Sequence, residues 1–118
     1  MKILKPEIAV ADSRGILKEV VKNFTWKQMN HFITKKGSVR GQHYHKYNLE
    51  LYYLLKGKLS VHITDVETKN ESRFLFEKGS CFIIEPYEYH TLRYLTNVEY
   101  IILLSEEFNS KNPDIYKL

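Results

Sequence analysis

Short apolar runs recur along the whole chain, separated by polar or glycine-containing turns. Leu59–Thr64 alternates strictly between apolar and polar residues, and Gly15–Val21 does so in part. Strict alternation is the pattern of a strand with one buried face. No window keeps the period of a helix, so the sequence predicts an all-β chain of many short antiparallel strands, arranged as a sandwich or barrel.

Turn residues divide the predicted strands. Leu55–Lys58 is predicted to be a hairpin turn joining two strands, and Glu77–Ser80 another turn. The polar stretch Val66–Ser72 is predicted to be a loop. Tyr100–Leu104 is apolar at every position, which predicts a strand covered on both faces.

The chain has 118 residues, enough for one hydrophobic core, and no linker or repeat divides it. We therefore predict a single domain over residues 1–118. The one cysteine, Cys81, cannot form an intramolecular disulfide, and we expect it to pack within the apolar run Cys81–Ile84. An unpaired thiol suits a reducing compartment. The N-terminus lacks the apolar core of a signal peptide, and no apolar run is long enough to span a bilayer. These observations predict a cytoplasmic protein without membrane contact.

The net charge of +4 comes from lysines that are scattered among acidic residues. Such interleaving is typical of a solvated surface, so we predict no nucleic-acid partner. A mildly positive surface also suits a small anionic substrate.

The candidate chemistry lies in five residues, Gly37, His43, His45, Glu50 and Gly57, which form the pattern G-x5-H-x-H-x4-E-x6-G. The two histidines alternate along a predicted strand, so both rings face one side of the sheet, where Glu50 from the next run can join them. Two imidazoles and a carboxylate on one barrel wall make a divalent metal site. The alternative is a hydrogen-bonded polar cluster without metal.

This pattern matches the first motif of the cupins at every specified position, and the chain resembles that superfamily. In the second cupin motif, G-x5-P-x-G-x2-H-x3-N, Gly79 and His90 match, whereas Glu85, Tyr87 and Tyr94 stand at the places of the proline, second glycine and asparagine. The resemblance implies a cupin jelly-roll barrel (a double-stranded β-helix). It also implies a divalent metal (Zn, Ni, Mn or Fe), no organic cofactor, and a homodimer, because small cupins commonly pair edge strands. The implied ligands are His43, His45, Glu50 and His90.

Three narrower resemblances concern sugar nucleotides. The D-x-R-G-x-x-x-E segment Asp12–Glu19 and the block Gln28–His43 resemble dTDP-4-dehydrorhamnose 3,5-epimerases. The R-G-x-H-x-H-K segment Arg40–Lys46 is similar to that of dTDP-sugar 3,4-ketoisomerases. The closing F-N-x-x-x-P-D-x-Y segment, Phe108–Tyr116, resembles the cupin domain of capsular polysaccharide assembly enzymes.

These resemblances imply an epimerase or isomerase that acts on a nucleotide-activated 4-keto-6-deoxy sugar in bacterial surface polysaccharide synthesis. Enolate chemistry requires a base, oxyanion stabilisation and an acid. The epimerase pattern implies His43 as base, yet His43 cannot be both base and metal ligand. The family's acid is a tyrosine on the last barrel strand, where Ile102 stands in this chain. Tyr100, two residues earlier, is the predicted acid. The predicted substrate-binding residues are Arg40 for the diphosphate, with Gln28, Asn30, Lys46 and Tyr52.

Two other functions stay open on the sequence. A metal-dependent cupin oxygenase would use free coordination positions of a His/carboxylate site for iron and dioxygen. A non-catalytic sugar-binding cupin would bind the same ligand without turnover.

The acid of the epimerase chemistry has further candidates besides Tyr100, which are Tyr44, Tyr52, Tyr87 and Tyr89.

Overall fold

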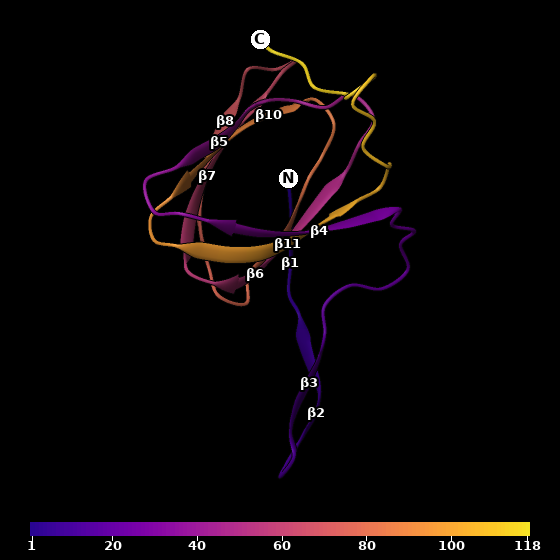
Figure 1. Ribbon diagram of the computed structural model, residues 1–118, viewed down its shortest axis with the longest axis vertical. Coiled ribbons are helices and arrows are strands. Elements are labelled where there is room, and N and C mark those ends of the chain that lie inside the picture. Colours follow the sequence, from indigo (N-terminus) through magenta and orange to yellow (C-terminus); the bar gives the residue numbers. More distant parts are fainter.

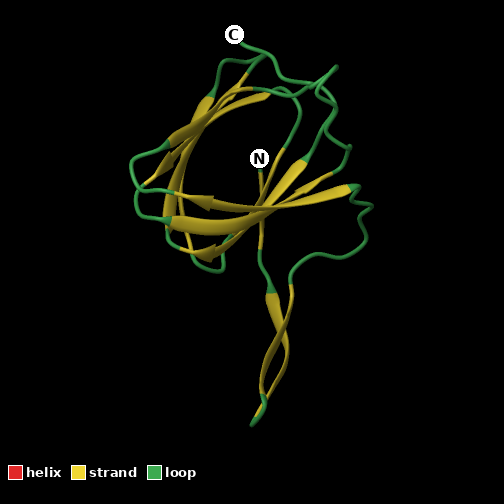
Figure 2. Ribbon diagram, viewed as in Figure 1, coloured by secondary structure: helices red, strands yellow, loops and turns green.

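The chain, described by a computed structural model over residues 1–118, consists of strands, turns and loops without any helix (Figure 2). The strands are β1 (Lys2–Leu4), β2 (Glu7–Asp12), β3 (Gly15–Glu19), β4 (Gln28–Thr34), β5 (Val39–His43), β6 (Glu50–Lys56), β7 (Lys58–Asp65), β8 (Glu71–Glu77), β9 (Cys81–Ile84), β10 (Glu88–Tyr94) and β11 (Val98–Leu104). The all-β prediction is confirmed. There is no helix, and hence none that is long and apolar enough to cross a membrane.

Two curved antiparallel sheets face each other around the core (Figure 1). One has the strand order β1-β9-β6-β11-β4 and the other β5-β10-β7-β8. Strand β7 confirms the predicted alternation, because Leu59, Val61 and Ile63 are buried while the residues between them are less so. They join a cluster of 14 buried residues between the sheets. The predicted jelly-roll barrel is the observed architecture.

The predicted hairpin at Leu55–Lys58 is wrong. Strand β6 pairs with β9 and β11, whereas β7 pairs with β10 and β8, so the chain passes from one sheet to the other at this turn. Gly57 allows the sharp crossing, since its φ is +96° and a Cβ there would lie 2.2 Å from the carbonyl oxygen of Asn97. Turn residues mark a reversal of the chain, but hydrogen bonding across the sheets decides which strands pair.

The loop predicted at Val66–Ser72 forms a true hairpin between β7 and β8, although β8 already begins at Glu71. On β11 the inward face is buried, and the outward face is half-buried. There Leu103 packs in a second cluster with Trp26 and Val21, while Cys81 is buried in the same cluster. Strand β11 was predicted to be covered on both faces. Its inward face is fully covered, and its outward face is covered only in part.

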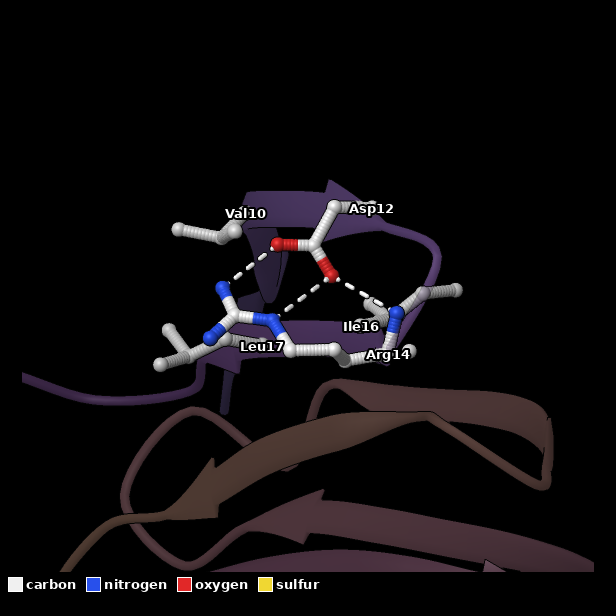
Figure 3. A pocket seen from close by; sticks show the side chains of 6 residues that line it. Val10, Asp12, Arg14, Ile16 and Leu17 are labelled. Atoms are coloured by element: carbon white, nitrogen blue, oxygen red, sulfur yellow. Dashed lines mark hydrogen bonds and ion pairs between the residues drawn. The ribbon is translucent and has the colours of Figure 1, made fainter.

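Strands β2 and β3 form a separate two-stranded arm that projects from the barrel (Figure 1). At its tip Arg14 donates to Asp12 through its backbone N–H at 2.9 Å and through its guanidinium at 2.7 Å (Figure 3). An open hollow of about 340 Å³ lies beside this pair, lined by Val10, Ile16 and Leu17 among others. The hollow lies on the arm and contains none of the predicted metal ligands.

Candidate active site

A β-bulge on β5 sets the geometry of the site. His43 lies opposite His90 on β10, but the next pair along the ladder is Gly41 with Thr91, so Gln42 is an extra residue. Gly41 and Gln42 both have positive φ, +84° and +59°. In a regular strand Arg40 and His43 would point to opposite faces; the extra residue brings both to the barrel interior. Both line the same internal cavity.

The predicted histidines converge, but His43 and His45 do not share a strand as predicted, because β5 ends at His43 and His45 follows it in the loop. The ring centroid of His43 lies 4.9 Å from that of His45 and 4.7 Å from that of His90. Ligand nitrogens of the three rings lie within 4.8 Å of one another. Glu50 joins them from β6, with its Oε1 3.0 Å from His45 Nε2 and 3.7 Å from His90 Nε2. The structure therefore brings together all four residues of the predicted metal set.

Backbone carbonyls orient two of these rings. His45 Nδ1 donates to the carbonyl oxygen of Asp114 at 2.8 Å, and His90 Nδ1 donates to that of Glu88 at 3.0 Å. In both rings Nε2 is thereby directed to Glu50. An Nδ1–H held by a carbonyl is the usual outer contact of a metal-binding imidazole, because it fixes the tautomer that leaves Nε2 free as a ligand. The donor set thus fits a divalent ion, and zinc and iron are among the ions that prefer such ligands.

Burial and the neighbouring imidazoles keep the rings of His43 and His90 neutral. Burial, followed by the nearby His90 and His45, lowers the pKa of His43 to about 4. Burial also lowers the pKa of His90. Both are therefore uncharged near neutral pH, the form that a general base and a metal ligand each require.

His45 and Glu50 behave as an ion pair. Burial disfavours the charged form of each, but the hydrogen bond between them and their opposite charges outweigh it. The pKa of His45 is consequently raised and that of Glu50 lowered. A metal ion bound here would take the place of the proton on His45 Nε2.

Two adjoining cavities meet at His43 and Glu50. One, of about 200 Å³, is lined by those two and by Phe32, Arg40, Gly41, Tyr52, His90, Leu92, Tyr94, Tyr100 and Ile102. The other, of about 160 Å³, extends to the C-terminal segment and is lined by Asn30, Phe32, His43, His45, Asn48, Glu50, Ile102, Leu104, Phe108, Pro113 and Ile115. A small molecule entering either cavity reaches the same histidine.

The predicted substrate-binding residues divide into three groups. Arg40 and Tyr52 line the first cavity, as does the predicted acid Tyr100. Asn30 lines the second cavity. Gln28 does not line it, but its Nε2 donates to Asn30 Oδ1 at 2.9 Å. Lys46 lines neither cavity; its ammonium lies over the ring of Tyr116, 4.2 Å from the centroid.

Two residues of the site carried no sequence prediction. Tyr94 lines the first cavity, and its signal was available, since His90 and Tyr94 are four residues apart on one strand and share a face. Asp114 lies far from the histidines in sequence. Its contact with His45 depends on how the C-terminal segment crosses the barrel end, which no local pattern reveals.

The fold and site define a small jelly-roll barrel whose interior holds a cluster of three histidines and Glu50. The chain belongs to the family described as the polysaccharide biosynthesis C-terminal domain, whose model matches residues 10–116. Comparison with curated protein sequences gave no match.

Several solved structures are similar to this chain. The capsular polysaccharide assembling protein CapF from Staphylococcus aureus is 25% identical with a TM-score of 0.73; the match covers 96% of this chain and 34% of CapF. The chain therefore spans about a third of the length of that relative. The WlaRB TDP-quinovose 3,4-ketoisomerase from Campylobacter jejuni superposes with a TM-score of 0.85 at 18% identity, covering 99% of this chain and 92% of that one. The dTDP-4-dehydrorhamnose 3,5-epimerase from Sulfolobus tokodaii has a TM-score of 0.78 at 22% identity, with 94% and 73% covered. The last two similarities concern the fold.

Proposed function

We propose that this chain is an epimerase or isomerase of a nucleotide-activated 4-keto-6-deoxy sugar in surface polysaccharide synthesis. One observation carries the proposal: a neutral histidine, His43, and an arginine, Arg40, line one cavity of about 200 Å³. The first is suited to remove a proton from carbon and the second to hold an anion. The two fold relatives whose names specify TDP- and dTDP-linked sugars support the same substrate class.

The chemistry follows from the acidity of hydrogens beside the 4-keto group. A ring nitrogen of His43 takes the proton from carbon 3 or 5, and the electron pair of the C–H bond moves to the keto oxygen, giving an enolate. Return of a proton to the other face of that carbon completes epimerisation. Ketoisomerisation instead protonates carbon 4 of the enediol and leaves the keto group at carbon 3. No oxidant or reductant is consumed in either case.

Arg40 is suited to bind the diphosphate. Its Nε donates to Thr34 Oγ1 at 3.0 Å, and its guanidinium lies 5.4 Å from the ring centroid of Phe32. Its two terminal nitrogens have no partner in the protein and can donate in parallel to phosphate oxygens. The Nε contact limits rotation of the guanidinium, which lowers the entropy lost on binding.

We also propose that His43, His45, Glu50 and His90 hold a divalent metal ion when it is present. Such an ion would supply Lewis-acid polarisation of the keto oxygen. It would compete with proton abstraction by His43, since that ring has one lone pair to offer. Metal content and exchange activity are therefore to be measured on the same preparation.

The direct test is deuterium exchange. The protein, with its metal content determined, is incubated in heavy water with dTDP-4-keto-6-deoxyglucose, and the positions of deuterium are located by NMR. We expect uptake at carbon 3 or 5 that falls by at least about 100-fold in His43→Ala, the usual contribution of a general base. His62→Ala is the matched control, because that ring lies on the outer face of the barrel and binds Glu71 at 2.8 Å. Absence of exchange in the wild-type protein would contradict the proposal.

A metal-dependent oxygenase is the second candidate, and the cluster of three imidazoles with Glu50 is the observation that favours it. It predicts oxygen uptake that is lost on iron removal, without deuterium exchange. Saturable sugar-nucleotide binding with neither exchange nor oxygen uptake would instead identify a non-catalytic sugar-binding cupin.

We further propose that the chain forms a homodimer through the β2–β3 arm. An isolated two-stranded hairpin is only marginally stable in water, yet Ile16 and Leu17 on this arm are 63% and 53% exposed. On the outer face of the edge strand β4, Met29 and Ile33 are 66% and 73% exposed. In a two-fold symmetric dimer, the arm of each protomer would pack on β4 of its partner. Both copies of the arm and of the β4 surface would then be removed from water.

A further inference from the structure

The backbone fixes the orientation of the Asn48 side-chain amide. Asn48 lies in the loop between β5 and β6, and its Oδ1 accepts a hydrogen bond from the backbone N–H of Glu106 at 3.1 Å. A backbone N–H can only donate, so the atom that it meets on Asn48 is the amide oxygen and not the nitrogen. The hydroxyl of Ser105 donates to the same oxygen at 3.2 Å. All hydrogen bonds of this amide within the protein are therefore made through its oxygen.

The Nδ2 group of Asn48 has no acceptor in the protein. Trp26 Nε1 is the one fully enclosed side-chain nitrogen or oxygen without a partner, so the Asn48 nitrogen adjoins open space. Asn48 is only 9% exposed, and it lines the second cavity, of about 160 Å³, together with His43 and Glu50. Its N–H groups are thus free to donate to a ligand that brings an oxygen atom into this cavity.

The second cavity is mostly apolar. Its apolar lining consists of Phe32, Ile102, Leu104, Phe108, Pro113 and Ile115. The charge of Glu50 in this cavity is balanced by His45, whose Nε2 donates to Glu50 Oε1 at 3.0 Å. In such surroundings a hydrogen bond to a developing negative charge is stronger than it is in water.

The shape of the proposed substrate determines which of its atoms meets Asn48. Carbon 4 stands across the sugar ring from carbon 1, so the keto oxygen and the diphosphate lie on opposite sides of the ring. Arg40 lines the first cavity, and His43 lines both cavities. With the diphosphate at Arg40 and carbon 3 or 5 at His43, the keto oxygen points into the second cavity, where Asn48 offers its N–H groups.

From this geometry we propose that Asn48 is a catalytic residue whose amide donates a hydrogen bond to the keto oxygen as the enolate forms. The inference rests on the proposed function and concerns the metal-free protein, in which His43 is free to act as the base. The proton on carbon passes to His43, and the electron pair of the C–H bond moves to the keto oxygen. The Nδ2–H group of Asn48 stabilises the negative charge on that oxygen without giving up its own proton.

Two substitutions remove this donor in different ways. Asn48→Asp keeps an oxygen for the Glu106 N–H and so preserves that contact, but it adds a negative charge. Asn48→Ala adds no charge, but it leaves the same N–H without its acceptor. The matched controls are Asn97→Asp and Asn97→Ala, because Asn97 Oδ1 also accepts from a backbone N–H, that of Lys36 at 2.9 Å, and Asn97 lines neither cavity. Thermal unfolding compares the stability of all four variants.

The deuterium-exchange assay on chelator-treated protein measures the effect. We expect kcat for exchange to fall about 100-fold in both Asn48 variants with KM nearly unchanged, as for the loss of one oxyanion donor. Both Asn97 variants should exchange like the wild type. Exchange at the wild-type rate in either Asn48 variant would overturn the assignment, since the loss in the other would then come from its added charge or its weakened loop. A rise in KM with kcat unchanged would overturn it too, because it would mean equal binding of substrate and transition state.

The wild-type protein separates this inference from the proposed function. Exchange by the wild type only with metal bound would assign the stabilisation of the keto oxygen to the ion, which overturns the role of Asn48 and leaves the proposed function intact. Absence of exchange both with and without metal would remove the proposed function and this assignment together.

Discussion

The carbonyl oxygen of Asp114 accepts a hydrogen bond from His45 Nδ1 at 2.8 Å, which joins the C-terminal segment to the histidine cluster. The carboxylate of Asp114 accepts three more, from the backbone N–H groups of Lys46, Tyr47 and Asn48 at 2.9, 3.1 and 3.0 Å. One residue thus holds the loop after β5 and sets the tautomer of a site histidine. It does so with a left-handed φ of 50°.

Replacing Asp114 tests this relationship. Asp114→Ala leaves the three N–H groups without their acceptor, and we expect the free energy of unfolding to fall by about 2–3 kcal/mol. The backbone carbonyl that binds His45 remains in this variant, but the segment that presents it is released from the loop, so zinc affinity should fall by roughly 10-fold. Asp114→Asn keeps one carbonyl oxygen and tolerates the positive φ, so its losses should be smaller. Urea unfolding and competitive zinc titration measure both quantities, and equal losses in the two variants would contradict this role.

Gly41 tests the bulge. A Cβ at this position would lie 2.6 Å from the carbonyl oxygen of His90, in backbone with φ of +84°. Gly41→Ala should destabilise the protein by about 1–3 kcal/mol and displace Arg40 or His43 from the cavity, lowering exchange. Gly37→Ala is the control, since its φ of +86° imposes the same strain but its Cβ meets nothing within 4 Å. A similar loss of exchange in both variants would show that strain, and not the contact with β10, limits activity.

Metal binding should stabilise the fold. At zinc concentrations about 100 times the dissociation constant, we expect a gain of about 2.7 kcal/mol in unfolding free energy. His45→Ala and His90→Ala should each abolish most of this gain, whereas His62→Ala should keep it. Differential scanning calorimetry with and without chelator gives the comparison. Stabilisation that persists in both site variants would place the ion elsewhere.

The pH dependence of exchange follows from the lowered pKa of His43. A general base acts in its neutral form, and with a pKa of about 4 this ring stays neutral from pH 7 down to about pH 5. The exchange rate of the metal-free protein should therefore stay level across that range and fall as the pH drops through 4. An ordinary histidine would lose activity already near pH 6.5. Initial rates in a series of buffers decide between the two profiles.

Substitution of the arm should separate dimerisation from folding. Val10 and Leu17 lie opposite each other on the arm and are both exposed. The double substitution Val10→Ser, Leu17→Ser should convert a dimer to a monomer in size-exclusion chromatography with light scattering, without loss of barrel stability. Leu75→Ser, at a position 68% exposed on β8, is the control and should stay dimeric. A monomeric wild type would contradict the dimer proposal.

Alternation along the chain was sufficient to predict strand β7. Leu59, Val61 and Ile63 are buried as expected, because a period of two directs every second side chain inward. Pairing was less predictable. The turn at Gly57 reads as a hairpin in the sequence, yet its flanking strands lie in different sheets, since strand partners are chosen by long-range hydrogen bonds and core packing.

Strand periodicity and motif spacing, which are local properties, predicted an all-β chain and the cluster of His43, His45 and Glu50. The resemblance to cupins added the jelly-roll barrel and His90. The surroundings of the cluster depend on the packing of the two sheets. The extra residue Gln42 turns Arg40 into the cavity, and Asp114 reaches His45 from the other end of the chain. Thr34, Tyr94 and Tyr100 form hydrogen bonds with one another only because strands from both sheets bring them together. Such contacts join residues distant in sequence, and their geometry is set by how the two sheets pack.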